Sequence, residues 1–270
     1  MAAAIPSPLA VSSRSCLLPR LFCHTRPHNW KRIILPFPTD SPPLRRAALG
    51  VFAHARRGFS FQEDDYASPS DLKFVPPLKI VEYPDPRLRA RNKRINTFDE
   101  NLKKLADEMF DVMYKTDGIG LSAPQVGMNI QLMVFNPAGE RGEGEEIVLV
   151  NPVVQKATKK TLLCNEGCLS FPGIFADVER PASVKIDARD IMGARFRFNL
   201  SKLPARVFQH EFDHLQGILF VDRMTKDVLD SIRSELKALE KKYEDLTEKP
   251  SPEKIDDYKQ SKQLVGFARA

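Results

Sequence analysis

The stretch Gln209–Gly217, QHEFDHLQG, contains the pattern His-Glu-x-x-His at residues 210–214. In a helix, two histidines four residues apart lie on one face, so both imidazoles can reach the same metal ion. Glu211 then lies beside that ion and can accept a proton from water. The other histidines of the chain all precede residue 60. The pattern therefore predicts a helix with a catalytic metal site, and an ordinary amphipathic helix with two histidines is the plainer alternative.

A tetrahedral catalytic site needs a third protein ligand in addition to the two histidines. The usual zincin companions, a downstream glutamate or an H-x-x-G-x-x-H continuation, are not evident after Gly217. Cys168, in NEGCLSFPG, is the best candidate, because a thiolate suits Zn²⁺ or Fe²⁺. Cys164 could serve instead, and either cysteine could be a small buried apolar residue.

A third string, DGIGLSAPQVG at residues 117–127, combines glycines with small and apolar residues. The glycines permit a close approach of a substrate to the backbone, and Gln125 offers an amide donor. The string lacks both G-K-S/T and G-x-G-x-x-G, so it does not predict a phosphate-binding loop. By itself it indicates no more than a turn after a helix.

Together, the three strings resemble the motifs of the peptide deformylase family. The chain contains G-I-G-L-S-A-P-Q at Gly118–Gln125, E-G-C-L-S at Glu166–Ser170 and Q-H-E-F-D-H-L at Gln209–Leu215. With K-I-V-E-Y-P-D-P-R-L at residues 79–88, the resemblance covers roughly residues 78–246. It implies an α+β fold in which the H-E-x-x-H helix is surrounded by antiparallel β-sheets and a C-terminal helix lies on the surface.

The resemblance also implies an activity. The family removes the N-formyl group from the initiator methionine of nascent proteins and releases formate. On this chain the implied ligands of one divalent metal ion, Fe²⁺ or Zn²⁺, are Cys168, His210 and His214. Glu211 would activate the metal-bound water, because the ion lowers the pKa of that water towards neutrality.

Further site residues follow from the same resemblance. The side-chain amide of Gln125 and the backbone N–H of Leu169 would stabilise the negative formyl oxygen. Gly120 would lie along the substrate backbone, and Ile119 would help to form an apolar methionine pocket. Glu166 resembles a family position near the entry of the substrate.

The N-terminal segment predicts import into an organelle. Residues 1–60 hold nine basic residues and one acidic residue after an Ala- and Ser-rich start, which is typical of a transit peptide. A basic tail kept on the mature protein is the alternative. With this segment in front, the chain resembles the plant organellar, bacterial-like (type 1B) deformylases. We therefore expect the chloroplast stroma as its location, with the mitochondrion as a further destination.

The net charge of the chain after residue 60 helps to predict its binding partners. The whole chain has a net charge of +6, but residues 61–270 hold 32 basic and 34 acidic residues. We therefore expect no direct binding of nucleic acid. No apolar stretch reaches the 18 or more residues of a membrane span, so no membrane association is expected. The expected partners are formyl-methionyl nascent polypeptides, with the organellar ribosome as a further candidate.

Hydrophobic periodicity predicts the elements of the domain. Apolar residues at helical spacing predict helices over residues 99–117, 201–217 and 226–246. Short β-rich runs predict strands over residues 130–135, 147–152, 153–158, 183–190 and 194–201. Little room for helices lies between these runs, so hairpins are expected rather than crossovers. A linker is predicted over residues 61–77, a catalytic domain over 78–246 and a flexible tail over 247–270.

Two other functions fit parts of the sequence. The H-E-x-x-H pattern alone would also fit a metallopeptidase that cuts internal peptide bonds. The basic isoelectric point of about 9.1 would fit a ribosome- or RNA-binding protein that resembles a deformylase. A cysteine as third ligand argues against the first, and the near neutrality of residues 61–270 argues against the second.

Overall fold

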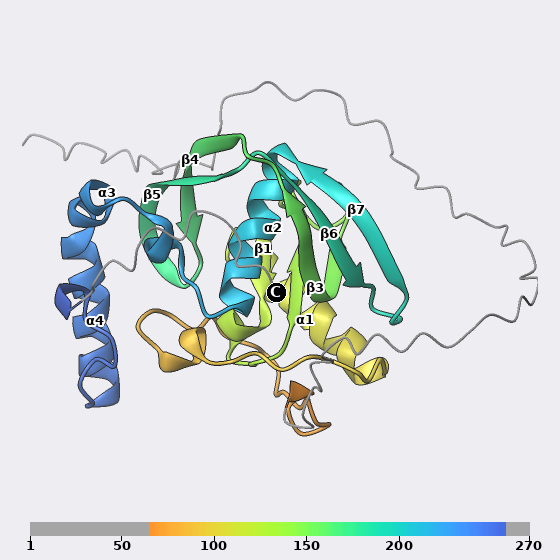
Figure 1. Cartoon of the computed structure of the whole chain (residues 1–270). Coiled ribbons are helices and arrows are strands. Elements are labelled where there is room, and N and C mark those ends of the chain that lie inside the picture. The colour runs from red at the N-terminus through yellow and green to blue at the C-terminus, as the bar shows by residue number, and fades with distance from the viewer. Residues whose placement is uncertain (1–64, 258–270) are drawn as a thin grey trace, which may run out of the picture. The chain divides into compact units, whose positions relative to one another are not determined.

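The computed structural model describes residues 65–257, and the predicted transit peptide lies outside these residues. The described residues form antiparallel β-structure and helices, which confirms the predicted α+β class (Figure 1). The strands are β1 (Gly120–Ser122), β2 (Leu132–Phe135), β3 (Ile147–Ala157), β4 (Thr161–Cys168), β5 (Phe171–Pro181), β6 (Ser183–Arg189) and β7 (Arg195–Ser201). The helices are α1 (Glu100–Lys115), α2 (Lys202–Leu215), α3 (Lys226–Ser231) and α4 (Arg233–Thr247).

Five strands form one sheet in the order β1-β2-β3-β6-β7, and every neighbouring pair is antiparallel. The prediction of hairpins rather than crossovers is therefore confirmed. The predicted runs at 147–152 and 153–158 form one strand, β3, with a register shift next to Asn151. Asn151 has φ of +50°, a conformation that asparagine tolerates, and its side chain hydrogen-bonds both backbone groups of Ile95.

The two faces of this sheet hold different helices. In β2, Leu132 and Val134 pack in one cluster with α1, whereas Met133 and Phe135 pack in another with α2. This alternation follows from the two-residue period of a strand. Because both faces are covered here, all four residues of β2 are buried. The motif helix α2 is therefore fixed against the centre of the sheet.

The hairpin of β4 and β5 covers another side of α2, and the sequence pattern did not predict it (Figure 1). Polar residues and a glycine interrupt β4, and charged residues, a glycine and prolines interrupt β5, so neither is a continuous β-rich run. In β5, Ile174, Ala176 and Val178 alternate with exposed residues and pack into a third cluster. Arg180 lies on the same buried face. Because arginine is not apolar, it interrupts the alternation of apolar and polar residues that would predict a strand.

The predicted helices α1 and α2 are present. Asp99 is the N-cap of α1, and its carboxylate accepts a hydrogen bond from the N–H of Leu102 at 3.0 Å. Ser201 occupies the N-cap of α2, although its side chain makes no capping hydrogen bond. The helix predicted over 226–246 is interrupted at Ile232 into α3 and α4. None of the helices in residues 65–257 has the length and apolar composition of a membrane span.

The domain is longer at both ends than the sequence predicts. In the predicted linker, Ala67 and Leu72 are buried in the cluster around α1. In the predicted tail, Ile255 is buried beside α4, and its N–H donates to the Glu240 carboxylate at 2.6 Å. The predicted linker and flexible tail are therefore wrong for residues 65–77 and 247–257. Each segment holds too few apolar residues to show periodicity, but its one or two apolar side chains are enough to anchor it.

The packing of α4 leads to a stability prediction. Leu236 is fully buried between α4 and the β5 cluster, whereas Leu246, on the same helix, is 74% exposed. We expect Leu236→Ala to lower the free energy of unfolding by about 2–5 kcal/mol, because it removes buried methyl groups and leaves a cavity. Leu246→Ala should change it by less than about 0.5 kcal/mol. Urea unfolding of both variants checks this, and equal effects would contradict the packing.

Candidate functional site

Three of the residues singled out in the sequence lie together at the centre of the domain. The motif helix α2 presents His210 and His214 one turn apart, and β4 ends at Cys168 beside them. The Cys168 sulfur lies 3.3 Å from Nε2 of His214. The donor atoms of all three residues lie within 4.8 Å of one another, and all three residues are buried. Cys164, the alternative ligand, is half-buried farther along β4 and is not in this cluster.

The three donors fit a divalent metal ion. Two ligands at about 2.0 and 2.3 Å from one tetrahedral ion lie roughly 3.5 Å apart, close to the separation of Cys168 and His214. Burial lowers the pKa of His214, which keeps its imidazole neutral, as a ligand must be. Burial opposes a charge on His210 as well, but Cys168 and Glu166 raise its pKa. A metal ion held by the three residues would supply a cation beside His210 in place of a proton on its ring.

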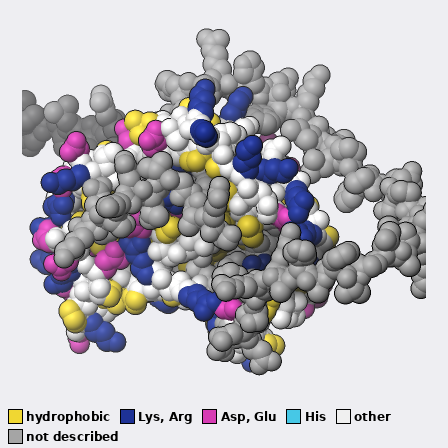
Figure 2. All heavy atoms as spheres, viewed as in Figure 1, with side chains coloured by type: hydrophobic (Ala, Val, Ile, Leu, Met, Phe, Trp, Pro, Cys, Tyr) yellow, Lys and Arg dark blue, Asp and Glu magenta, His cyan; other side chains and the backbone are white. Residues whose placement is uncertain are grey.

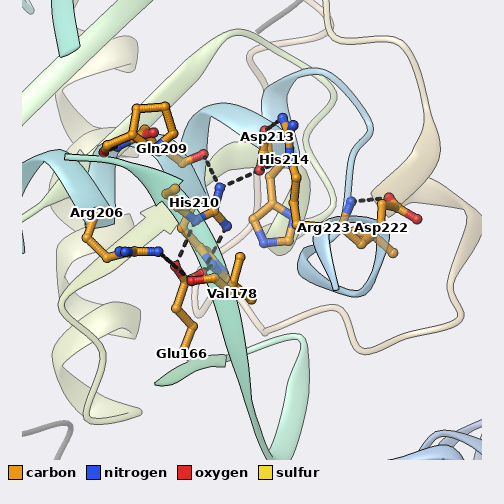
Figure 3. Close-up of polar contacts among 12 residues, drawn as sticks. Glu166, Val178, Arg206, Gln209, His210, Asp213, His214, Asp222 and Arg223 are labelled. Atoms are coloured by element: carbon orange, nitrogen blue, oxygen red, sulfur yellow. Dashed lines mark hydrogen bonds and ion pairs between the residues drawn. The ribbon is translucent and has the colours of Figure 1, made fainter. Parts of the chain in front are cut away.

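Glu166 orients the first histidine of the motif. One carboxylate oxygen lies 3.0 Å from Nδ1 of His210, which leaves Nε2 to face the cluster (Figure 3). Arg180 donates to both oxygens of this carboxylate at 2.7 and 2.9 Å, and Arg206 donates to one at 2.8 Å. Although burial alone would raise the pKa of Glu166, Arg180 and His210 hold it well below its usual range. Glu166 is therefore a buried carboxylate that fixes a ring.

This arrangement corrects the expectation for Glu166. The resemblance implies a position near the substrate entry, but the side chain is 6% exposed and both its oxygens are already hydrogen-bonded. A bound peptide would find no free acceptor there. Its contact is instead with a candidate metal ligand, as is common for the partners of metal-binding histidines.

Arg180 also ties the hairpin to the motif helix, which the sequence did not indicate. It donates to the Asp213 carboxylate at 2.6 Å, and Arg223 donates to the same carboxylate at 3.0 Å from its Nε (Figure 3). Arg180 and Asp213 are almost completely buried. Asp213 lies inside the motif, and a charged residue that is buried on a helix is a signal for such a pair. Its partner Arg180 lies 33 residues away in the chain, so no local pattern identifies it.

Glu211 lies on the side of α2 that faces β1. The side chain is 4% exposed, and its Oε2 atom has no hydrogen-bond partner. A Cβ atom at Gly120 would lie only 2.7 Å from the other Glu211 oxygen, Oε1, so glycine is needed for β1 to pass this close. Burial raises the pKa of Glu211 to about 7, against the opposing effects of His210 and the Ser122 hydroxyl. A carboxylate with such a pKa can both accept and return a proton near neutral pH.

Gln125 is held with its amide nitrogen towards the cluster. Its carbonyl oxygen accepts hydrogen bonds from the N–H and the hydroxyl of Ser122 at 2.9 and 2.8 Å. This fixes the amide so that Nε2 lies 3.6 Å from the Cys168 sulfur and 3.4 Å from the Ser170 hydroxyl. Leu169 follows Cys168 in the short turn between β4 and β5. Two potential donors, a side-chain amide and a backbone N–H, therefore border the cluster.

The remaining predicted residues form the strand opposite α2. Gly120 begins β1 and pairs with Phe135, and Ile119 precedes it as a half-buried residue. Ile119 packs at the edge of the cluster around α2. The structure thus brings Ile119, Gly120 and Gln125 to the same side of the motif helix as Glu211.

The orienting contact of Glu166 predicts a change in metal affinity. We expect Glu166→Gln to weaken divalent metal binding by about 10–100-fold, because a neutral amide no longer holds His210 as the carboxylate does. Glu179→Gln, an exposed position of the same hairpin, should leave affinity unchanged. Competition with a chromogenic chelator measures both variants. An unchanged affinity in Glu166→Gln would exclude the orienting role.

Comparisons with known proteins agree with this geometry. Residues 77–229 match the sequence model of the polypeptide deformylase family. Over 225 residues the chain is 66% identical to "Peptide deformylase 1B, chloroplastic" of Oryza sativa subsp. japonica, with 80% of this chain and 84% of the relative covered. It is 68% identical over 210 residues to "Peptide deformylase 1B, chloroplastic/mitochondrial" of Arabidopsis thaliana, with 78% and 77% covered. A crystal structure of a plant peptide deformylase 1B superposes with a TM-score of 0.67 at 73% identity, covering 67% of this chain and 99% of that one.

Proposed function

The chain belongs to the peptide deformylase family, and from this membership we infer that it removes the formyl group from nascent formyl-peptides. The family is metal-dependent, and the buried cluster of Cys168, His210 and His214 is the observation that supports this function best. A buried thiolate and two imidazoles without a cation would be an unfavourable group of donors. Glu211 beside this cluster supplies the base that hydrolysis of an amide needs.

We propose that Cys168, His210 and His214 hold one divalent ion, Fe²⁺ or Zn²⁺. When bound, such an ion lowers the pKa of a coordinated water and polarises the formyl oxygen. The mixed sulfur and nitrogen donors are accepted by both metals. Three protein ligands also leave one position open, as catalytic sites require.

In the proposed mechanism, Glu211 transfers the proton. Its carboxylate accepts a proton from the attacking water and later passes it to the amine of the departing methionine. The unpaired Oε2 atom and the raised pKa support this role. The close contact with Gly120 restricts the position of the carboxylate. The Glu211 side chain therefore loses little conformational freedom when it transfers the proton.

Gln125 and Leu169 are proposed as donors to the formyl oxygen. As the carbon becomes tetrahedral, this oxygen gains negative charge, and preorganised N–H groups stabilise it. Ser122 already fixes the orientation of the Gln125 amide, which supports this role. For the substrate, we propose that Gly120 lies along the peptide backbone and that Ile119 contributes to an apolar pocket for methionine.

The location and partners follow from the relatives. Those named above are chloroplastic, and one is chloroplastic/mitochondrial. We propose that this chain acts in the chloroplast stroma, with import into the mitochondrion as well, and that residues 1–60 are the transit peptide that directs it. Its proposed partners are formyl-methionyl nascent polypeptides, and the organellar ribosome is the place where it would meet them.

The function is tested by formate release from a formyl-methionyl peptide. The full chain is purified without oxygen, stripped with a chelator and reloaded with Fe²⁺ or Zn²⁺ in parallel. We expect formate from the loaded enzyme, none from the stripped enzyme, and no cleavage of an unformylated protein. Peptide-bond cleavage without formate would replace this function by that of a metallopeptidase. If neither metal restored formate release, the metal assignment would be wrong.

A further inference from the structure

One face of the five-stranded sheet is only partly covered. Helix α2 packs on one face, and α1 packs on the other face over β1, β2 and the Val150 region of β3. Val150 pairs with Arg189 of β6, which pairs in turn with Arg195 of β7. These arginines therefore lie on the same face as α1 but beyond its edge, where they are exposed. We call this region of β3, β6 and β7 the open sheet face.

The open sheet face contains a cavity with a basic lining. The cavity has a volume of about 200 Å³. Its lining includes Arg94, Asn151, Gln155, Asp187, Arg189 and Arg195. Lys156 and Lys185 extend the basic surface, because they pair across β3 and β6 on the same face. Figure 2 shows dark blue side chains gathered on the side where Figure 1 places β6 and β7, whereas blue and magenta alternate over α4.

The negative charge at the centre of this face is already compensated. Asp187 accepts hydrogen bonds from Arg195 at 2.7 Å to both its oxygens and from Arg197 at 2.7 Å. These contacts, first from Arg195, lower the pKa of Asp187 to about 2. Within residues 65–257, Lys156 and Lys185 form no ion pair. Arg189 donates a hydrogen bond to the uncharged backbone carbonyl of Gly193. The face therefore carries excess positive charge at neutral pH.

The positive charges are spread over three neighbouring strands. Neighbouring strands are about 5 Å apart, and residues on one face of a strand recur about every 7 Å. Lys185 and Arg189 lie on either side of Asp187 on β6, and Arg195 and Arg197 lie beside Asp187 on β7. Lys156 lies next to Lys185 on β3. A single small anion would need only the cavity. Cations that extend over three strands, on both sides of a compensated carboxylate, match a polymer with repeated negative charges.

We propose that the open sheet face binds the phosphate backbone of RNA. The residues that line the cavity include no aromatic side chain, and the ring of Phe98 nearby is already covered by the Arg189 guanidinium, 5.8 Å from its centre. Base stacking is therefore not provided, and binding would not depend on sequence. A membrane surface would instead be favoured by exposed apolar side chains between the cations, and the outward residues of β6 and β7 offer none. The near neutrality of residues 61–270 predicts no RNA binding, but it averages over a surface on which the charges are unevenly placed.

This inference does not rest on the proposed function. The open sheet face and the Cys168 cluster lie on different sides of the sheet, since α2 packs on the opposite face. RNA on the open sheet face would therefore leave the peptide site accessible. Substitutions at Lys156 and Lys185 should accordingly leave formate release unchanged, which separates a failure of this proposal from a failure of the proposed function.

The test compares variants of the full chain, so that the basic residues 1–60 contribute equally to each. Binding of a short mixed-sequence RNA is measured by fluorescence anisotropy over a range of salt concentrations. For Lys156→Gln combined with Lys185→Gln, we expect affinity at low salt to fall by about tenfold and the salt slope to fall by about 1.4. The control combines Lys241→Gln with Lys249→Gln, two exposed lysines on or next to α4, and should match the parent.

A second measurement locates the bound RNA directly. Bound RNA should protect Lys156 and Lys185 from acetylation in the parent chain, and an equal concentration of vesicles with anionic lipid should not. The proposal is overturned if the Lys156 and Lys185 variant binds RNA like the parent. It is equally overturned if vesicles protect these lysines and RNA does not, since the face would then bind a membrane.

Discussion

The Glu211→Gln variant is expected to lose formate release by about 10²–10⁴-fold while it keeps its metal ion. Glutamine has nearly the same shape, so the contact with Gly120 persists, but its amide cannot accept a proton from water. The proposed ligands Cys168, His210 and His214 are untouched. The measurement is steady-state formate release together with the metal content of the same preparation, which separates a lost base from a lost ion.

A matched control for this substitution is Glu240→Gln. Glu240 is a buried carboxylate as well, but it lies on α4 and accepts a hydrogen bond from Tyr83 at 3.1 Å, away from the candidate site. Its substitution should lower the melting temperature and leave formate release per folded molecule near that of the parent. If Glu211→Gln kept activity within tenfold of the parent, another group would have to accept the proton.

Replacement of Cys168 by alanine is expected to abolish both metal retention and formate release. The substitution removes the only sulfur of the proposed ligand set and leaves two imidazoles, which is one ligand short of a catalytic site. Metal content after gel filtration and formate release should therefore fall together. Excess Fe²⁺ or Zn²⁺ in the assay should restore little activity, because the ligand itself is missing.

Cys164→Ala is the corresponding control, since it makes the same change four residues earlier in β4. The Cys164 side chain is half-buried and outside the cluster, so metal content and activity should equal those of the parent. The opposite pattern, with metal lost from Cys164→Ala and kept by Cys168→Ala, would show that the proposed ligand set is wrong.

The parts of the fold that could be predicted are those specified by neighbours in the chain. Helices α1 and α2 show a continuous apolar period, and Asp99 caps α1. Strands β2, β3, β6 and β7 are β-rich runs bounded by turn residues. The hairpin of β4 and β5 was missed because its buried face includes Glu166 and Arg180, which are stable there only as partners of each other.

In the candidate site too, local spacing predicted some features, and contacts between distant parts of the chain decided the others. The two motif histidines lie four residues apart, so the α-helical repeat alone places them on one face of α2. The choice between Cys164 and Cys168 stayed open on spacing, because the position of a strand end beside a helix depends on long-range pairing. The role of Glu166 was wrong for the same reason, since its contacts come from three other segments of the chain.

The sequence by itself determined the motif helix, its two histidines and the position of Glu211, the proposed base, between them, because these depend on local helical geometry. It also determined the family, because three motifs occur in the family order. The spacing of the residues left Cys164 and Cys168 open, and the tertiary structure places Cys168 beside the histidines, as the family resemblance implies. Only the tertiary structure decided how Arg180 and Glu166 orient His210, and that the basic residues of β6 and β7 gather on the open sheet face. These features join residues distant in the chain, and their energies depend on burial and mutual distance, which exist only in the folded domain.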